Sequence, residues 1–324
     1  MYKVAIYTNF PLTPTPGYME FFRTIFSSGK FELVDVNNPM SADFAICFNH
    51  TKENLEKIVS SKIPVEKRVL IMLECKQILP VMHTAKVLKE YGTIFAPSQN
   101  WAKDFNKILF DYPFYLKSTL NNPPLKERQY KLGIIQRNKF SCIKGELYTL
   151  RREVIKNLGY DRIAVRGEGW NVPVFIQFFL YIKIVIHYLR IINRSNIRFF
   201  PRFLIRSNKF TPVLDKQDFL AQIQVAVVIE NSADYVSEKI FDCFRAGTVP
   251  IYVGPSLVDF GIPLETAIQC EPNANSILTV VNNIDSFNLE EIVFHGQKFL
   301  KDSGRNWDES ISMKRLAEKL IAEI

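Results

Sequence analysis

Histidine and cysteine are scarce in this sequence, with four histidines and five cysteines among 324 residues. The cysteines form no Cys-x-x-Cys pair and no cluster with histidine, so a structural zinc site is not expected. An odd number of cysteines without a framework pattern favours reduced thiols over disulfides. The sequence also opens on a strand-like run instead of an apolar leader, so we expect a cytoplasmic protein.

Acidic residues are absent from the stretch between Glu168 and Asp215, although the whole chain carries a net charge of only +8. The same stretch holds seven lysines and arginines, which nearly account for the excess charge. Because the rest of the chain is close to neutral, a general nucleic-acid-binding surface is not expected.

Residues 169–182 are uncharged, but this run is shorter than the roughly 20 residues that a membrane span requires. An arginine then recurs at every fourth position, which on a helix would form one basic stripe that Pro201 interrupts. Two interpretations remain open for 169–209. It is either a buried helix followed by a solvated basic face, or an interfacial element that contacts anionic lipid, peripheral on the inner membrane face. The stripe consists of Arg190, Arg194, Arg198, Arg202 and Arg206.

The length favours two domains, and strand-like and helical patterns alternate along most of the chain. We expect an acceptor-side domain over 1–125, ending at the Pro-rich linker 121–128, and a second domain over 126–305 with an insertion at 169–209. A helix over 306–324 is expected to return to the first domain. The pattern predicts two Rossmann-like α/β domains with parallel sheets, facing each other across a ligand cleft at the carboxyl ends of the strands. The strands expected are 3–8, 31–36, 42–48, 68–73, 93–97, 131–136, 163–166, 225–229 and 249–253, and the helices are 19–27, 52–60, 78–91, 145–158, 238–246 and 307–324.

The most informative run is 225–255, VAVVIENSADYVSEKIFDCFRAGTVPIYVGP. It reads as a buried strand, a polar loop, a helix and a second buried strand. Ser237 has the type of an N-cap residue and Gly247 that of a helix terminator. Lys239 then falls in the first helical turn, where a cation is favourable only if an anion such as phosphate occupies the unpaired N–H groups.

This run resembles the donor-binding signature of the α-1,3-fucosyltransferase family (glycosyltransferase family 10, bacterial type). There a strand ending in Glu-Asn-Ser leads into Tyr-Val-Thr-Glu-Lys, a helix and Ala-Gly-x-Val-Pro-x-x-x-Gly. The resemblance covers roughly 215–263, with serine in place of the commoner threonine at 237. It implies a GT-B fold whose C-terminal domain binds GDP-fucose, with Lys239 on the diphosphate. The residues implied to contact the donor are Glu230, Asn231, Ser232, Tyr235, Glu238 and Lys239.

Two further site residues are expected from the chemistry of an inverting transfer, which needs a base for the acceptor hydroxyl and cations for the leaving diphosphate. Glu74 ends the apolar run RVLIMLE and is followed six residues later by Pro80, a spacing similar to that of the family's catalytic glutamate. The family also places a phosphate-binding arginine on the helix after strand 131–136. Arg151 is favoured by its spacing to Leu158, with Arg152 and Arg137 as competitors.

The resemblance implies transfer of L-fucose from GDP-fucose to a glycan hydroxyl, with α-1,3 linkage to N-acetylglucosamine as the first expectation. An oligosaccharide or a lipid-linked glycan would be the acceptor. No Asp-x-Asp occurs in the chain, so neither a metal nor another cofactor is expected to be required. The alternatives are a related GT-B transferase with a different nucleotide sugar and, in another class, a membrane-surface adaptor that works through its arginines.

Overall fold

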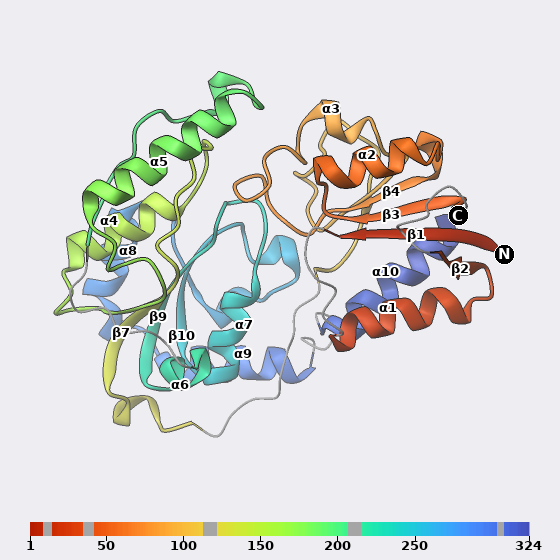
Figure 1. The fold of residues 1–324 in the computed structure, drawn as a ribbon. Helices are drawn as coiled ribbons and strands as arrows, with labels where there is room; N and C mark the ends of the chain where they lie inside the picture. The colour runs from red at the N-terminus through yellow and green to blue at the C-terminus, as the bar shows by residue number, and fades with distance from the viewer. Residues whose placement is uncertain (9–14, 35–41, 113–121, 207–214, 303–307, 324) are drawn as a thin grey trace. The chain divides into compact units, whose positions relative to one another are not determined.

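The computed structural model describes residues 1–8, 15–34, 42–112, 122–206, 215–302 and 308–323, which form two compact units (Figure 1). The first unit comprises Met1–Leu116 and Arg305–Ile324, and the second comprises Lys117–Gly304. The chain therefore divides before the expected boundary at 125. Each unit is built around one sheet in which all of the pairings are parallel.

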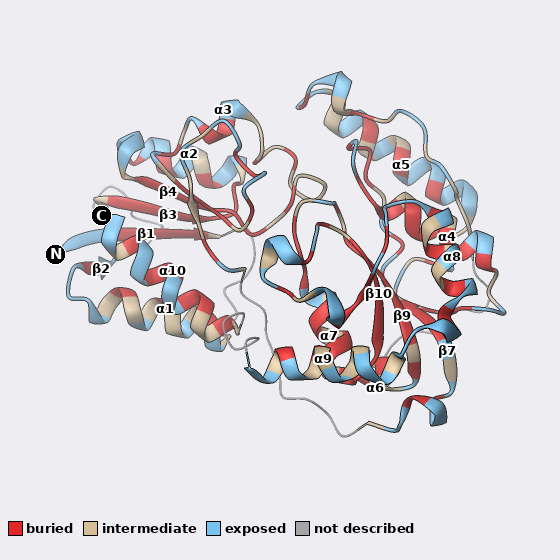
Figure 2. Ribbon diagram, turned by 180° about the vertical axis from the view of Figure 1, so that it is seen from behind, coloured by how far each residue is buried: buried red, intermediate tan, exposed pale blue. Residues whose placement is uncertain are grey.

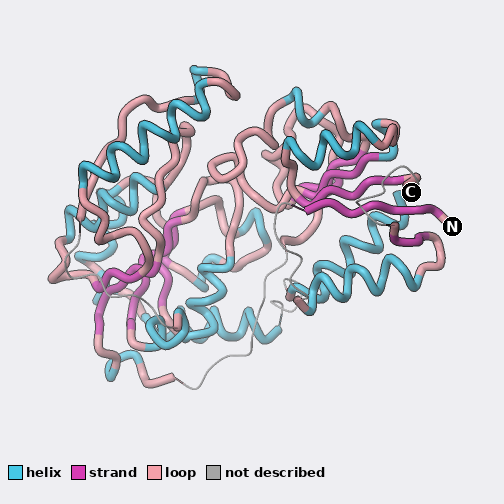
Figure 3. The backbone as a smooth tube through the Cα atoms, viewed as in Figure 1, coloured by secondary structure: helices cyan, strands magenta, loops and turns pink. Residues whose placement is uncertain are grey.

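The first unit contains a six-stranded sheet in the order β2-β1-β3-β4-β5-β6. Its central strands are nearly continuous runs of buried apolar residues, because helices cover both faces of the sheet. Figure 3 shows these strands with α2 and α3 on one side and α1 and α10 on the other. The strands are β1 (Tyr2–Thr8), β2 (Phe31–Leu33), β3 (Phe44–Phe48), β4 (Arg68–Ile71), β5 (Thr93–Ala96) and β6 (Ile108–Leu109).

The C-terminal helix α10 (Glu309–Glu323) packs against α1 (Pro16–Ser27), so its expected return to the N-terminal unit is confirmed. Helix α10 buries Leu316 and Leu320 in the same apolar cluster as strand β1. At the start of α1, the Thr15 hydroxyl donates a hydrogen bond of 2.6 Å to Glu309. A Cβ on Gly17 would lie 2.1 Å from the Glu309 side chain, so only glycine permits this close approach.

The second unit has a five-stranded sheet in the order β11-β10-β9-β7-β8. The chain runs from β7 to β8 on one side and then crosses to β9 on the other side of β7. The sheet therefore has a topological switch point between β7 and β9, where ligands of open α/β sheets usually bind at the carboxyl ends. The strands are β7 (Tyr130–Ile135), β8 (Ala164–Arg166), β9 (Ile223–Ile229), β10 (Val249–Val253) and β11 (Ile268–Gln269).

Helices flank this second sheet. Helix α4 contacts α8, whereas α7 contacts α6 and α9. Helix α7 ends as expected at Gly247, whose backbone is left-handed with φ 57°. The helices of this unit are α4 (Tyr148–Leu158), α5 (Val174–Leu189), α6 (Lys216–Ala221), α7 (Glu238–Ala246), α8 (Ala274–Asn282) and α9 (Leu289–Asp302).

Two expectations for secondary structure are wrong. The helix expected over 78–91 is confined to α3 (Ala85–Leu88), and the residues before it form turns. Successive turns replace the helix, with backbone bonds from Met82 to Leu79, from His83 to Pro80 and from Thr84 to Val81. The basic stripe is not one helix either. Helix α5 ends at Leu189, Arg194 lies in a 3-10 turn, and the chain from Arg198 onwards is irregular.

His50 follows strand β3 and is buried, with its Nδ1 atom 2.9 Å from the Tyr91 hydroxyl. Burial lowers the pKa of His50 to about 4, from an ordinary value of 6.5. The unfolded chain therefore binds more protons than the folded chain between these two pH values. Stability from this group is complete above pH 6.5 and is lost as the pH falls towards 4.

We expect the first unit to lose about 2 kcal/mol of stability between pH 7 and pH 5 through His50 alone. His50→Gln should remove this part of the pH dependence. The measurement is hydrogen exchange of the β3 and β4 amides, corrected for the intrinsic rate at each pH. An unchanged pH slope in the variant would show that other groups cause the acid sensitivity.

Candidate functional site

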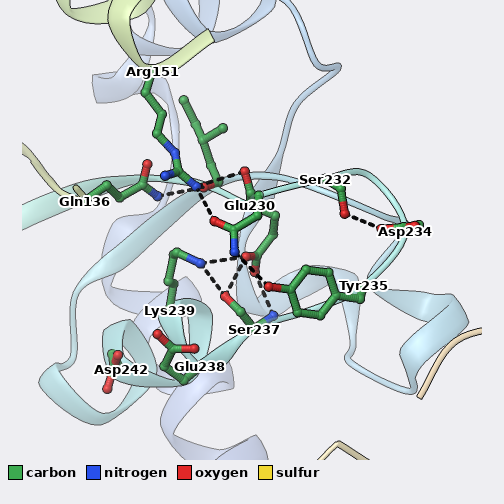
Figure 4. A network of polar contacts seen from close by, with 12 residues as sticks. Gln136, Arg151, Glu230, Ser232, Asp234, Tyr235, Ser237, Glu238, Lys239 and Asp242 are labelled. Carbon is green, nitrogen blue, oxygen red and sulfur yellow. Dashed lines mark hydrogen bonds and ion pairs between the residues drawn. The ribbon is translucent and has the colours of Figure 1, made fainter. Parts of the chain in front are cut away.

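Polar side chains gather where strands β7 and β9 end, at the switch point of the second sheet (Figure 4). Gln136 follows β7, and its amide donates a hydrogen bond of 2.8 Å to the carbonyl oxygen of Ile229, the last residue of β9. Glu230 comes next, and its backbone N–H donates to the carbonyl of Val253 on β10. The ends of three adjacent strands are thereby fixed to one another.

The Glu230 side chain is fully buried and holds the loop that follows it. Its Oε1 accepts a hydrogen bond of 2.9 Å from the Ser237 backbone N–H. Its Oε2 accepts a hydrogen bond from the Ser237 hydroxyl. The same oxygen lies 2.9 Å from Lys239 Nζ, with which it forms an ion pair. The carboxylate thus closes the loop 231–236 onto the start of α7, as Figure 4 shows.

The Glu230–Lys239 pair is shielded from water, because the lysine side chain is 17% exposed and the glutamate side chain is not exposed. Lys239 also donates to the Ser237 hydroxyl at 2.6 Å. Among the described residues these contacts engage two of the three N–H donors of the ammonium group. The third donor can serve an oxygen of a bound ligand.

Arg151 of helix α4 is brought to the same place. Its Nη2 atom donates to the carbonyl oxygens of Ile229 and Glu230 at 2.8 and 3.0 Å, and to the Asn231 side-chain oxygen at 2.9 Å. Burial lowers the pKa of Arg151. Asn231 extends the network, because its amide donates to the Tyr235 hydroxyl at 2.8 Å. The arginine therefore joins helix α4, the end of β9 and the loop.

The two competing arginines lie differently. Arg152 is buried on α4 but donates to the Lys139 carbonyl at 2.8 Å and stacks on the Phe140 ring. Burial lowers the pKa of Arg152 to about 10. Arg137 is exposed and forms an ion pair of 3.0 Å with Glu168. Of the three, Arg151 is the one that contacts the end of β9.

The N-terminus of α7 lacks a side-chain cap. Ser237 occupies the N-cap position, but its hydroxyl donates to Glu230 instead of accepting from the helix, so the expected capping hydroxyl is wrong. Glu238 in the first turn is 53% exposed and lies 3.9 Å from Lys216. The Glu238 carboxylate accepts from its own backbone N–H, and the N-terminal turn of the helix with Lys239 forms an arrangement that suits a phosphate oxygen.

Ser232 is buried and bonds to the carboxylate of Asp234 within the loop. Its backbone forms an antiparallel bridge with Glu146, a residue that sequence reasoning missed. The buried Glu146 carboxylate accepts from the Thr149 N–H at 2.9 Å and pairs with Arg198 at 2.8 Å. An acidic residue shortly before a helix is a capping signal that would have identified Glu146. Its partner Arg198 is 52 residues away along the chain and carried no such signal.

Glu74 lies in the first unit, three residues after Ile71, where strand β4 ends; the strand had been expected to reach Leu73. Its backbone carbonyl is 2.9 Å from His83 Nε2, and the neighbouring Leu73 N–H donates to the Asn49 side chain at 2.7 Å. These bonds hold the segment after β4 at the carboxyl edge of its sheet. Glu74 is half-buried there.

The five cysteines are free and buried. Among the described residues no group of three or more histidine, cysteine, aspartate or glutamate side chains is placed to hold a metal ion.

No family model matches the chain, and no curated protein sequence matches it significantly. Solved structures do resemble it. Anabaena HepE (Alr3699) in complex with UDP-glucose aligns over 100% of both chains with a TM-score of 0.58 and 10% identity. Sucrose-phosphate synthase from Thermosynechococcus elongatus aligns over 100% of both chains with a TM-score of 0.54 and 10% identity. An α1,3-fucosyltransferase with GDP aligns over 99% of this chain and 89% of its own, with a TM-score of 0.50 and 12% identity.

These likenesses, together with the two parallel sheets and their interleaved helices, show that the chain has the GT-B fold of glycosyltransferases. The expected fold class is confirmed.

We expect Glu230→Gln to destabilise the second unit by about 3 kcal/mol, because it leaves the Lys239 charge without its buried partner. Replacing both residues, as Glu230→Gln with Lys239→Met, should recover much of this loss. Glu238→Gln is the matched control, since that side chain is exposed, and should change stability by about 0.5 kcal/mol at most. Hydrogen exchange of the β9 and β10 amides measures all of these effects. Equal losses in Glu230→Gln and the control would contradict the anchoring role of Glu230.

Proposed function

We propose that this chain is an inverting glycosyltransferase that moves L-fucose from GDP-fucose to a hydroxyl of a glycan, with α-1,3 linkage to N-acetylglucosamine as the preferred product. The observation that carries the proposal is the Glu230–Lys239 pair at the uncapped start of α7, at the β7–β9 switch point. The GT-B fold and the likeness of 225–255 to the fucosyltransferase donor signature support the same reading.

The donor diphosphate would bind at the start of α7. Its oxygens would accept from the first-turn N–H groups and from the remaining donor of Lys239. Asn231 and Glu238 would contact the ribose, a phosphate or the sugar. Glu230, Ser232 and Tyr235 are buried, so we assign them to the shape of the loop that presents these contacts.

Arg151 would add positive charge behind the diphosphate. Its Nη2 atom is used by oxygens of 229–231, so any contact with phosphate would come from the rest of the guanidinium group. Lys239 pairs with the buried Glu230 carboxylate, and the buried Arg151 guanidinium donates to backbone and amide oxygens, so its charge is available to an anionic ligand. As GDP leaves, the same charge stabilises its developing negative charge, and we propose that no metal is required.

The acceptor would be activated by Glu74. In this step the glutamate takes the proton of the acceptor hydroxyl while the hydroxyl oxygen attacks the anomeric carbon of fucose. The bond from that carbon to the diphosphate breaks, and GDP departs with its electron pair. A carboxylate at the carboxyl edge of the first sheet is placed on the unit that does not contain the donor motif.

A second candidate is transfer from a UDP-sugar. HepE with UDP-glucose has a higher TM-score than the fucosyltransferase with GDP, 0.58 against 0.50. The contacts proposed above would recognise a diphosphate and a ribose, which both donor classes contain.

We expect calorimetry to detect binding of GDP-fucose to the wild-type protein and none of UDP-glucose at the same concentration. Lys239→Gln should weaken GDP binding by about 1.5–3 kcal/mol, the size of a charge-assisted hydrogen bond. Lys131→Gln is the control, because Lys131 pairs with Asp285 on an exposed surface at the start of β7. A folded Lys239→Gln protein that binds GDP like the wild type would refute the diphosphate site. Preference for UDP-glucose would favour the second candidate.

We expect Glu74→Gln to lower turnover by about 10²–10⁴ while GDP-fucose binds as in the wild type, since a general base acts on the acceptor. The matched control is Glu66→Gln in the exposed turn before β4, at the opposite end of the same strand. Single-turnover rates with saturating donor separate the chemical step from binding. Retention of most of the activity would show that the base lies elsewhere.

A further inference from the structure

One face of helix α5 exposes a stripe of large apolar side chains. The α5 stripe consists of Phe175, Phe178, Phe179 and Ile186, which are 65%, 39%, 67% and 52% exposed. Their spacing places them together on one side of the helix. Figure 2 shows much of α5 in the pale blue of exposed residues. A soluble protein normally puts polar residues on such a face, and a continuous apolar one marks an interaction surface.

The opposite face of α5 holds the helix firmly in this orientation. Tyr181 is buried, and its hydroxyl donates to the Arg198 carbonyl at 2.7 Å. The fully buried Gln177 amide donates to the carbonyl oxygens of Val172 and Ile205 at 2.7 and 2.6 Å. Val185 completes this inner face in a cluster with Ile143. The helix cannot turn its stripe inwards without breaking these contacts, which disfavours the interpretation of an ordinary buried helix.

The positive charge near the α5 stripe favours an anionic partner. The surrounding acid-free run exposes a set of basic residues: Lys183, Arg190, Arg194, Arg202 and Arg206. Arg198 does not belong to this set, because it pairs with the buried Glu146. Phe200, which is 70% exposed, lies among them in the sequence and adds a further apolar group. A second copy of the chain would bring the same positive charges together and is disfavoured.

We propose that the α5 stripe docks on a membrane surface that contains anionic lipid. The apolar side chains would enter the boundary between headgroups and acyl chains, and the basic residues would contact lipid phosphates. Within the described residues no helix is long and apolar enough to cross a bilayer. Helix α5 would therefore lie in the plane of the membrane.

A hydrogen bond, an ion pair and a backbone bridge connect this surface to the candidate site. Arg198, which accepts from Tyr181 of α5, pairs with Glu146, and the backbone of Glu146 bridges to Ser232 in the loop after β9. The membrane surface would hold the second unit close to a lipid-linked glycan. That last step rests on the proposed function, whereas membrane binding itself does not.

The test is co-sedimentation with vesicles of phosphatidylcholine alone and of phosphatidylcholine mixed with phosphatidylglycerol. We expect the wild-type protein to bind the mixed vesicles, and to bind less as salt is added. Phe175→Asn with Phe179→Asn should lower binding about tenfold or more, and Arg190→Gln with Arg194→Gln should do the same. Two controls on α9 should bind like the wild type, namely Phe294→Asn, which replaces an exposed phenylalanine, and Lys298→Gln with Lys301→Gln.

The proposal is overturned if the wild-type protein binds neither kind of vesicle, or if the α5 variants bind as well as the controls. It is also overturned if light scattering shows a dimer that only the phenylalanine variant dissociates, because the stripe would then join two copies. GDP affinity is measured on the same proteins. It should be equal in all of them, so a failure of membrane binding is distinguished from a failure of the donor site.

Discussion

The second unit depends on one buried carboxylate. Glu230 lies where β9 ends, and its two oxygens accept from the backbone and hydroxyl of Ser237 and from Lys239. A charge in this position is costly unless each oxygen is satisfied, so the loop has few alternatives to the observed course. The same carboxylate contributes to raising the pKa of Tyr252 well above its ordinary value, after the larger effect of burial. That phenol therefore stays neutral beneath the loop. The geometry of the candidate site follows from satisfying this single anion.

Local signals in the sequence were sufficient to predict the secondary structure of the strand–loop–helix–strand unit over 225–255. Helix α7 and strand β10 have the expected bounds, because Gly247 ends the helix and a run of buried apolar residues follows it. The contacts within the loop were not predictable in the same way. Ser237 has the residue type and position of a cap, yet its hydroxyl bonds to a carboxylate seven residues earlier. Propensity describes a residue and its immediate neighbours, whereas this bond depends on how the loop folds back on the strand.

The same distinction explains the failures elsewhere. Apolar spacing over 78–91 resembles a helix, but successive turns and the bond between His83 and the Glu74 carbonyl occupy the chain before Ala85. The arginines of 190–206 are evenly spaced in sequence, yet Arg198 points to a carboxylate on another segment while Arg190 remains in solvent. Even spacing does not distinguish a stripe on one helix from a chain that leaves the helix. The apolar content of α5 was visible in the sequence, but which of its faces is exposed depends on what packs against Tyr181 and Gln177.

Burial separates the residues of the 225–255 run into two groups, those that fix the loop and those that can contact a ligand. Glu230, Ser232 and Ser237 are inaccessible, and they fix the course of the loop. Asn231, Glu238 and Lys239 keep exposed surface, so these motif residues have room to contact a ligand. Under the proposed function, the motif would shape a diphosphate site more than it would specify the identity of the nucleotide base. Under the same proposal, side chains outside 225–255 would distinguish guanine from uracil, because hydrogen bonds to the base are what distinguish the two donors. The motif accordingly carries more weight for diphosphate binding than for the choice of sugar nucleotide.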